Sequence, residues 1–164
     1  MSELVDRVDE EDRVLGVVER DEAIRQGWLH RVATTVCSAP DGRILVHRRP
    51  DDDRRFPGQL NWLLGGAANA GESYEEAAAR ELAEELGVRL RPRLVLTFRC
   101  AGVISPYWLG VHEVVVTGPI RPDPAEIAWH AWVTEAELAE LVREEDFLPD
   151  GRDAYERYQA HGRA

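Results

Sequence analysis

Residues 65–88, GGAANAGESYEEAAARELAEELGV, determine more about the fold than any other part of the chain. Ser73, with Glu76 three positions later, has the pattern of a capping box, and Gly87 is a residue type that commonly ends helices. We therefore predict a helix that begins after Ser73 and ends near Gly87. The glycines and small residues of 65–71 predict a flexible loop before it.

Three carboxylates share one face of this predicted helix. Glu81, Glu84 and Glu85 are three and four positions apart, so their side chains project together. Such a cluster repels itself unless cations bind between its members, and hard oxygen ligands favour Mg²⁺ or Mn²⁺. Leu82 and Leu86 form a neighbouring apolar stripe. The helix is therefore expected to cover a sheet with one stripe and to hold metal with the next.

The spacing of the charged residues and glycines is also informative. Gly66 is followed by five residues, Glu72, seven residues and then RELAEELGV from Arg80. This order resembles the Nudix box, G-x5-E-x7-R-E-U-x-E-E-x-G-U with U apolar, at every specified position. The resemblance implies an α/β fold, an α/β/α sandwich with a mixed β-sheet. It also implies Mg²⁺-dependent hydrolysis of a nucleoside diphosphate linked to another group.

The resemblance further implies a role for each box residue. The implied metal ligands are Glu81, Glu84, Glu85 and the main-chain carbonyl of Gly65, with Glu81 and Glu84 also acting in catalysis. The implied structural positions are Gly66, Gly87 and the pair of Glu72 and Arg80. Because Glu72 lies at the helix start and Arg80 beside the carboxylates, we expect this pair to fix the loop to the helix.

Outside the box the chain resembles the branch of the family related to isopentenyl-diphosphate isomerase. The similar stretches are GWLHR at 27–31, HRR at 47–49, FPG at 56–58 and VHEV at 111–114. The isomerase cysteine, however, aligns with Gly65, and a glycine can neither act as a thiolate nor protonate an alkene. Isomerase activity therefore remains an alternative to hydrolysis, as does a non-catalytic nucleotide-binding domain, which the intact set of box carboxylates disfavours.

Two carboxylates beyond the box are candidates for completing the site. The resemblance makes Glu113 a metal ligand, whereas strand alternation would equally leave it a half-exposed strand residue. Glu126 lies in a proline-rich loop, where it is either a general base that reaches the substrate or a solvated side chain.

Further candidates for substrate contact lie at strand ends. Arg48 and Arg49 point to opposite faces, so at most one reaches a diphosphate, the alternative being ion pairs with aspartates 51–53. His30 is expected to be a hydrogen-bonded structural residue rather than a metal ligand. Tyr107 and Trp108 either stack on a base or belong to the core.

Composition excludes several classes of protein. The 20 basic residues are all Arg, against 31 acidic ones, and the net charge of −11 disfavours polymeric nucleic acid and membrane surfaces as partners. The absence of Lys excludes a phosphate-binding P-loop and Schiff-base chemistry. Cys37 and Cys100 are expected to be buried apolar residues rather than a disulfide. A small-molecule nucleoside diphosphate derivative is the expected ligand.

The rest of the chain predicts one domain over 1–164. Residues 1–27 predict a hairpin of strands 4–8 and 14–18 and a short helix capped by Asp21. Further strands are predicted at 31–38, 43–48, 94–100, 109–117 and 129–133, with a last helix that Thr134 and Glu137 cap. No membrane-spanning run or targeting peptide is visible, so we expect a cytoplasmic protein, either a monomer or a homodimer.

Overall fold

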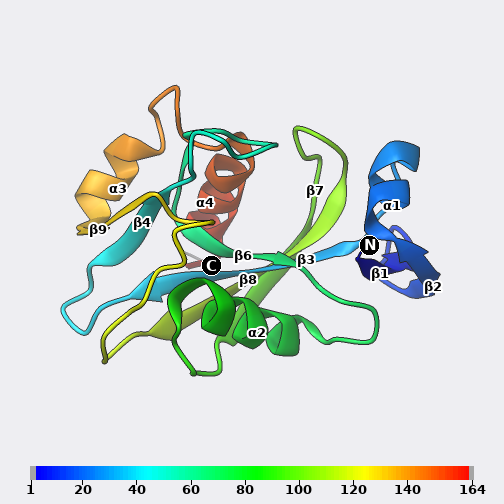
Figure 1. Ribbon diagram of the computed structural model, residues 1–164, viewed down its shortest axis with the longest axis horizontal. Helices are drawn as coiled ribbons and strands as arrows, with labels where there is room; N and C mark the ends of the chain where they lie inside the picture. The colour runs from blue at the N-terminus through cyan, green and yellow to red at the C-terminus, as the bar shows by residue number, and fades with distance from the viewer. Residues whose placement is uncertain (1–2, 163–164) are drawn as a thin grey trace.

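The computed structural model describes residues 3–162 and places helices on both faces of a central sheet (Figure 1). The strands are β1 (Leu4–Val8), β2 (Val14–Glu19), β3 (Arg31–Ser38), β4 (Ile44–Arg48), β5 (Leu60–Asn61), β6 (Leu63–Ala67), β7 (Arg93–Cys100), β8 (Tyr107–Val115) and β9 (Trp129–Val133). The helices are α1 (Arg20–Gln26), α2 (Tyr74–Leu86), α3 (Glu135–Leu141) and α4 (Pro149–Gly162). In this described part of the chain, no helix has the length and apolar character needed to cross a bilayer.

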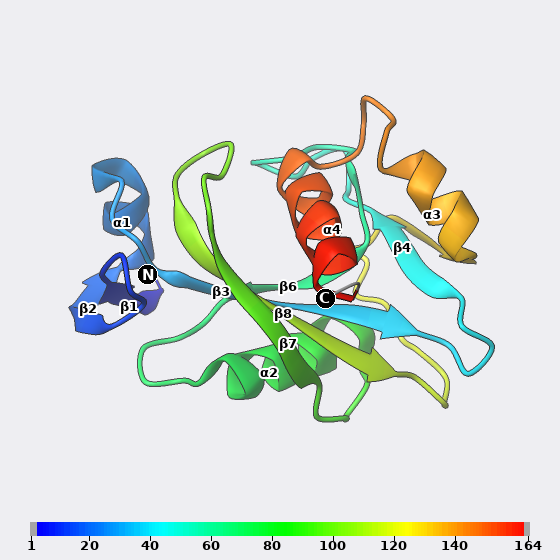
Figure 2. The same cartoon turned by 180° about the vertical axis from the view of Figure 1, so that it is seen from behind.

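The central sheet has seven strands and is built around β3. Strand β8 pairs with β3 in parallel, while β6 pairs with β3 in the antiparallel sense, with Gly65 opposite Thr34. Strands β4, β5 and β9 extend one side of the sheet and β7 closes the other. Strands β1 and β2 form a separate antiparallel hairpin at one end of the molecule (Figure 2). The mixed sheet and the N-terminal hairpin confirm the fold predicted from the sequence.

Each face of the sheet carries its own apolar core. On one face Leu82 and Leu86 of α2 pack against Leu64 of β6. On the other face Trp62 is 1% exposed, its indole N–H donates to the Gly151 carbonyl at 2.8 Å, and aromatic residues of α4 pack edge-on against its ring. The two cores hold α2 and α4 against opposite faces, which fixes the orientation of the carboxylate face of α2.

The start of the box differs from the predicted loop. Gly65 and Gly66 belong to β6 rather than to a flexible segment. A β-carbon on Gly65 would lie 2.0 Å from the Ala33 carbonyl oxygen, so β6 approaches β3 more closely there than any side chain permits. Of the predicted loop at 65–71, only the part from Ala68 onward has no regular secondary structure.

The C-terminal region contains two helices where one was predicted. The capping box of Thr134 and Glu137 begins α3 as expected, but α3 ends after seven residues. Phe147 and Leu148 are buried in the core, and Pro149 then begins α4. Proline is favoured at the first position of a helix because it lacks an N–H that would otherwise be unsatisfied there. At the other end of the chain, α1 has Glu19 at its N-cap, with the predicted cap Asp21 inside the first turn.

The N-terminal hairpin is tied to the irregular segment before α2. The Ala70 amide donates to the Leu4 carbonyl at 2.9 Å, and the Gly71 amide donates to the Asp6 carboxylate at 3.1 Å. Asp12 pairs with Arg31 at the start of β3 at 2.8 Å. These contacts fix α1 and its hairpin beside the end of the sheet from which the box loop emerges.

Candidate active site

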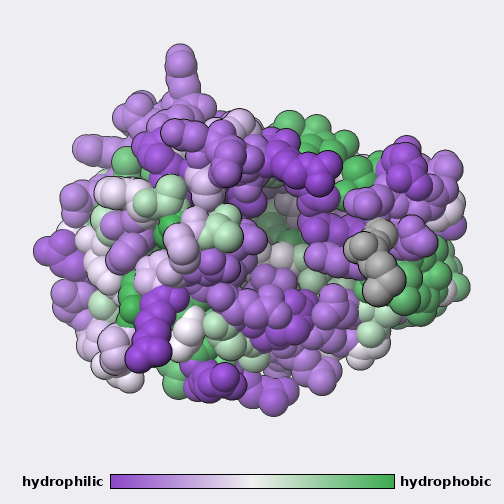
Figure 3. All heavy atoms as spheres, in the orientation of Figure 1, coloured by the Kyte–Doolittle hydropathy of each residue, from purple (hydrophilic) through white to green (hydrophobic). Residues whose placement is uncertain are grey.

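A cavity of about 1090 Å³ opens where β3, β4 and β6 meet α1. Figure 3 shows this hollow and the largely hydrophilic residues around its rim. The box contributes Gly65, Gly66 and all three carboxylates of α2 to the cavity wall. Ligand pockets commonly measure roughly 300 to 1,000 Å³, so this one has room for a molecule considerably larger than a diphosphate group.

The carboxylates of Glu81 and Glu85 face each other beneath strand β6. Glu85 is 7% exposed, and the two carboxyl groups are close enough to share a hydrogen bond when one of them is protonated. Gly66 provides the room for this arrangement, because a β-carbon there would lie 2.8 Å from an oxygen of Glu81. The small residue of β6 and the acidic face of α2 thus form one site.

Burial makes these carboxylates costly to ionise. Burial first, and then the charges of Glu81 and Glu126, raise the pKa of Glu85 well above its ordinary value. Burial also raises the pKa of Glu81, although the neighbouring Arg80 opposes that shift. Apposed buried carboxylates are the arrangement in which a bound cation gives the greatest stabilisation, since it removes the repulsion and replaces lost solvation.

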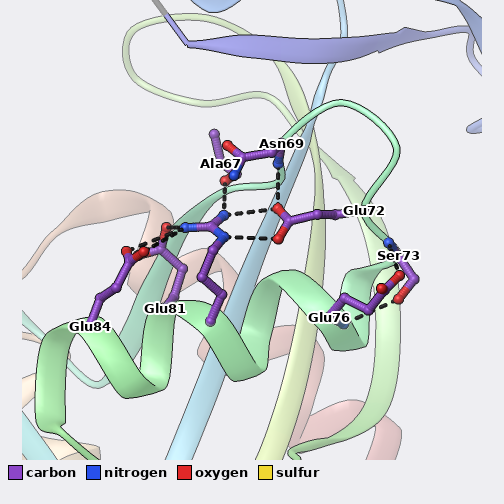
Figure 4. A network of polar contacts seen from close by, with 8 residues as sticks. Ala67, Asn69, Glu72, Ser73, Glu76, Glu81 and Glu84 are labelled. Carbon is purple, nitrogen blue, oxygen red and sulfur yellow. Dashed lines mark hydrogen bonds and ion pairs between the residues drawn. The ribbon is translucent and has the colours of Figure 1, made fainter.

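Arg80, within α2, connects the segment before the helix to strand β6 through Glu72 and Ala67, which Figure 4 labels. Its Nε donates to Glu72 Oε2 at 2.8 Å and its Nη2 donates to Glu72 Oε1 at 2.9 Å, a bidentate pair. The same Nη2 also donates to the Ala67 carbonyl at 3.1 Å, while the Asn69 amide donates to Glu72 at 2.6 Å. The pair therefore fixes the segment between β6 and α2 in one position.

The remaining nitrogen of Arg80 lies among the metal-ligand candidates. Its Nη1 donates to Glu81 Oε1 at 2.9 Å and to Glu84 Oε2 at 3.3 Å. Glu84 is therefore turned toward Arg80, away from a common centre with Glu85. Within residues 3–162 no three acidic, histidine or cysteine side chains converge closely enough to coordinate one ion. In this conformation the guanidinium supplies the positive charge that the carboxylates require.

Strand alternation separates Glu113 and Arg48 from this cluster. Glu113 of β8 points to the α4 face, where its carboxylate pairs with Arg93 and accepts from the Tyr158 hydroxyl at 2.7 Å. Arg48 donates to the Gly58 carbonyl at 2.6 Å and pairs with Asp146. Neither residue lines the cavity, so the structure does not bring Glu113 to the metal-ligand candidates or Arg48 to a substrate there.

Arg49 and Glu126 do reach the cavity. Arg49 lines it while holding Asp53 at 2.7 Å, and its neighbour Arg48 points elsewhere, as expected for consecutive strand residues. Glu126 comes from the loop before β9, and burial raises the pKa of its carboxyl, with Arg49 opposing the shift. A loop carboxylate of this kind, near both an arginine and the α2 cluster, is suited to accept a proton.

The two aromatic candidates and the two cysteines lie in different parts of the structure. Tyr107 lines the cavity, and its hydroxyl donates to Asp150 at 2.6 Å. The Trp108 indole instead donates to the Asp9 carbonyl at 3.1 Å, outside the cavity wall. Cys37 and Cys100 are both buried free thiols, as the sequence predicts.

A family model described as a NUDIX domain matches residues 28–158. The chain belongs to the Nudix family. It is 41% identical to the uncharacterized Nudix hydrolase SCO1686 of Streptomyces coelicolor, over 161 residues that cover 96% of this chain and 89% of the relative. The crystal structure of DR0079 from Deinococcus radiodurans has 31% identity and a TM-score of 0.80, covering 94% of this chain and 98% of that one.

A more distant Nudix domain, that of Shewanella oneidensis NrtR in complex with ADP-ribose, superposes with a TM-score of 0.64. It is 14% identical, covers 87% of this chain and 98% of that one, and thus shares the fold alone. The named relatives and the family match make this Nudix protein a hydrolase that acts on diphosphate bonds.

The Nudix cavity also contains basic residues that sequence reasoning did not select. Arg20, at the start of α1, and Arg55, in the loop between β4 and β5, both line it. His30, expected to be hydrogen-bonded in the fold, lines the cavity as well. Arg20 and Arg55 lie outside every stretch that resembles the family, whereas His30 belongs to GWLHR at 27–31, and the packing of the N-terminal unit beside the sheet places all three on one cavity.

Proposed function

We propose that this enzyme is a Mg²⁺-dependent pyrophosphohydrolase of a small nucleoside diphosphate derivative, cleaved by attack of water at phosphorus. The observation that supports this most strongly is the apposition of Glu81 and Glu85 at the wall of a large cavity, one of them almost fully buried. Arg80 bonds to Glu81 alone of this pair, so the buried Glu85 carboxylate favours a divalent metal as its missing partner.

The donor set fits such a metal in its chemistry. Glu81, Glu85 and the Gly65 carbonyl would hold it, and Glu84 would join them on release from Arg80. All of these ligands are hard oxygens, which suit Mg²⁺ or Mn²⁺ better than thiolate-preferring ions. When bound, the metal supplies Lewis-acid polarisation of the phosphoryl oxygens.

The side chains of the cavity would perform the remaining tasks. Arg49 lies on the cavity wall, where its guanidinium can neutralise charge on the phosphate oxygens. Glu84 and Glu126 both line the cavity and are exposed, and either would orient the attacking water and accept its proton. The Glu72–Arg80 pair acts indirectly, by holding β6 and α2 in register.

Size and charge favour a small anionic substrate that extends beyond its diphosphate. The cavity volume of about 1090 Å³ accommodates a nucleoside and a further group. The ADP-ribose bound by the NrtR domain is a ligand of this chemical type in the same fold. The net charge of −11 opposes long nucleic acids, which bind through extended basic surfaces.

Isomerase chemistry is the alternative within the same family, and the structure gives it little support. At Gly65 the backbone leaves no space for a cysteine, because a β-carbon would lie 2.0 Å from the Ala33 carbonyl. A purely nucleotide-binding domain is the other alternative, and it gives no reason to bury Glu85 against Glu81.

Incubation of the pure protein with nucleoside di- and triphosphates, sugar nucleotides, dinucleotides and isopentenyl diphosphate tests the proposal. We expect Mg²⁺-dependent hydrolysis of at least one of them, identified by product mass and abolished by EDTA. Glu84→Gln should lower that activity by about two orders of magnitude or more, whereas Glu113→Gln, whose carboxylate faces α4, should retain it. Nucleotide binding that is independent of Mg²⁺, without turnover of any compound, would instead favour the binding domain.

A further inference from the structure

One end of the cavity lies beside the start of α4 and is largely apolar. Leu63 of β6 and Leu109 of β8 contribute to its wall, and both belong to the core on the α4 face of the sheet. Asn61 of β5 and Tyr107 of β8 line the same end. The box carboxylates and the arginines of the cavity come from other elements, namely α1, α2 and the segment after β4. This end is therefore suited to an uncharged part of a ligand.

The side-chain amide of Asn61 is held in one orientation by the main chain. Its Oδ1 accepts from the amide of Trp62 at 2.9 Å and from that of Leu63 at 3.3 Å. A β-carbon on Gly151 would lie 2.4 Å from the same oxygen, so the first turn of α4 packs directly against it. Only the oxygen of an amide can accept from a main-chain N–H, and this fixes the side on which the nitrogen lies.

The amide nitrogen of Asn61 is thereby left as a donor without a partner. Asn61 is half-buried, and its Nδ2 donates to no atom within residues 3–162 while remaining accessible in the cavity wall. Both lone pairs of Oδ1 are used, so the group cannot make the combined donor and acceptor contact by which asparagine recognises adenine. It can only donate, and a ligand must offer it an acceptor oxygen or nitrogen.

The carboxylate of Asp150 disfavours a phosphate at this end. Asp150 precedes Gly151, and its Oδ2 accepts from the Tyr107 hydroxyl at 2.6 Å while its Oδ1 accepts from the Val103 amide at 3.2 Å. An anionic group placed here would face a carboxylate rather than a guanidinium. The half-buried ring of Tyr107 instead offers a surface on which a planar base can stack.

This end also lies within reach of the proposed metal ligands. Asn61 precedes Gly65 by four residues, and four residues span at most about 14 Å of main chain. In a nucleoside diphosphate, a ribose and a phosphate group separate the base from the anhydride bond. A base beside Asn61 is therefore compatible with a diphosphate beside the carboxylates of α2.

We propose that Asn61 is a specificity-determining residue that donates a hydrogen bond to a carbonyl oxygen of the nucleobase. The inference rests on the proposed function, which supplies the nucleoside diphosphate. Guanine, hypoxanthine, uracil and cytosine each carry such an oxygen, whereas adenine carries none. The amino group of adenine opposite Asn61 would set two donors against each other and leave both without an acceptor.

Inosine and adenosine 5′-diphosphates provide a matched pair of probes, because position 6 of the purine carries a carbonyl oxygen in the first and an amino group in the second. Titration in EDTA gives their dissociation constants without turnover. We expect the inosine compound to bind the wild type about tenfold more tightly or better, since the competing base leaves a donor unpaired. It should also shift the side-chain ¹⁵N signal of Asn61.

Two substitutions of Asn61 test the contact itself. Asn61→Asp keeps an oxygen for the amides of Trp62 and Leu63 and replaces the donor by an acceptor. Asn61→Ser removes the donor without adding charge. Each should reduce the ratio of the two affinities to about one or reverse it, with urea denaturation reporting that the fold is retained. Asn69→Asp adds the same charge at an exposed residue elsewhere on the cavity wall and should leave the ratio unchanged.

Four results would overturn the proposal. They are equal affinity of the wild type for the two diphosphates, tighter binding of the adenosine compound, an affinity ratio that survives both substitutions of Asn61, and failure of either compound to bind with or without Mg²⁺. Hydrolysis of both compounds with equal affinity would refute the base contact and leave the hydrolase function standing. Selective binding without any turnover would support the contact and count against the hydrolase.

Discussion

Replacing Gly65 with alanine should weaken the contact between β6 and β3. The new β-carbon would lie 2.0 Å from the Ala33 carbonyl oxygen and 2.8 Å from the Thr34 Cα, both of them main-chain atoms. Since neither neighbour can rotate away, β6 must move by more than an ångström along a pairing that extends from Val32 to Val36 of β3. Overpacking of this kind usually costs about 1 to 3 kcal/mol, and a backbone clash belongs at the upper end.

A loss of about 3 kcal/mol is readily measured by urea denaturation. With a slope of roughly 1 to 3 kcal/mol per molar urea, the midpoint should fall by about 1 to 3 M. Gly66→Ala provides the informative comparison, because the three atoms nearest its β-carbon, the first at 2.8 Å, all belong to the Glu81 carboxylate, which can rotate. That variant should lose no more than about 1 kcal/mol of stability, while hydrolysis falls at least tenfold as Glu81 is displaced.

Gly16→Ala is the matched control, since a β-carbon at this position of β2 meets nothing within 4 Å. Its urea midpoint and activity should both equal those of the wild type. A Gly65→Ala protein with an unchanged midpoint would refute the argument that close approach of the backbones, rather than loop flexibility, requires glycine at this position.

Three further predictions concern the site and its support. Glu126→Gln should lower kcat by about 10²-fold or more if this carboxylate accepts the proton of water, whereas Glu113→Gln should not, and steady-state kinetics separate the two. Burial opposes ionisation of Glu72, but hydrogen bonds from its arginine partner and from the Asn69 amide lower its pKa below the ordinary 4.5. The melting-temperature difference between wild type and Glu72→Gln should therefore be full at neutral pH and disappear as the pH falls through the lowered pKa; an undiminished difference in acid would contradict it. Leu86→Ala should cost about 2 to 5 kcal/mol in urea denaturation because its side chain is fully buried, whereas Leu90→Ala, 40% exposed, should cost far less.

The elements that the sequence predicted well are those with local determinants. Ser73 and Glu76 form the predicted capping box, and Gly87 ends α2 in the left-handed conformation. The same applies to Thr134 and Glu137 at the start of α3. Caps and apolar stripes involve residues only a few positions apart, so they are visible without knowledge of the tertiary structure.

Features that depend on long-range packing were beyond the reach of the sequence. The face to which Glu113 points depends on the register of β8 against β3, which no local pattern specifies. The glycines at 65 and 66 resemble a loop until the approach of β3 is known. Arg20 and Arg55 lie far apart in the chain, and they share a cavity only because the N-terminal unit packs beside the sheet.

The hairpin and α1 form a part of the chain that is separate from α2 and β6, which carry the proposed metal ligands. The proposed metal ligands come from one continuous motif on α2 and β6, whereas another part of the cavity wall comes from residues such as Arg20 and Ile24 of α1. Substitutions in that wall can change which molecules are admitted without altering any catalytic side chain. Leu4 and Asp6 accept hydrogen bonds from the amides of Ala70 and Gly71. A ligand bound against α1 would therefore also stabilise the segment that leads into α2.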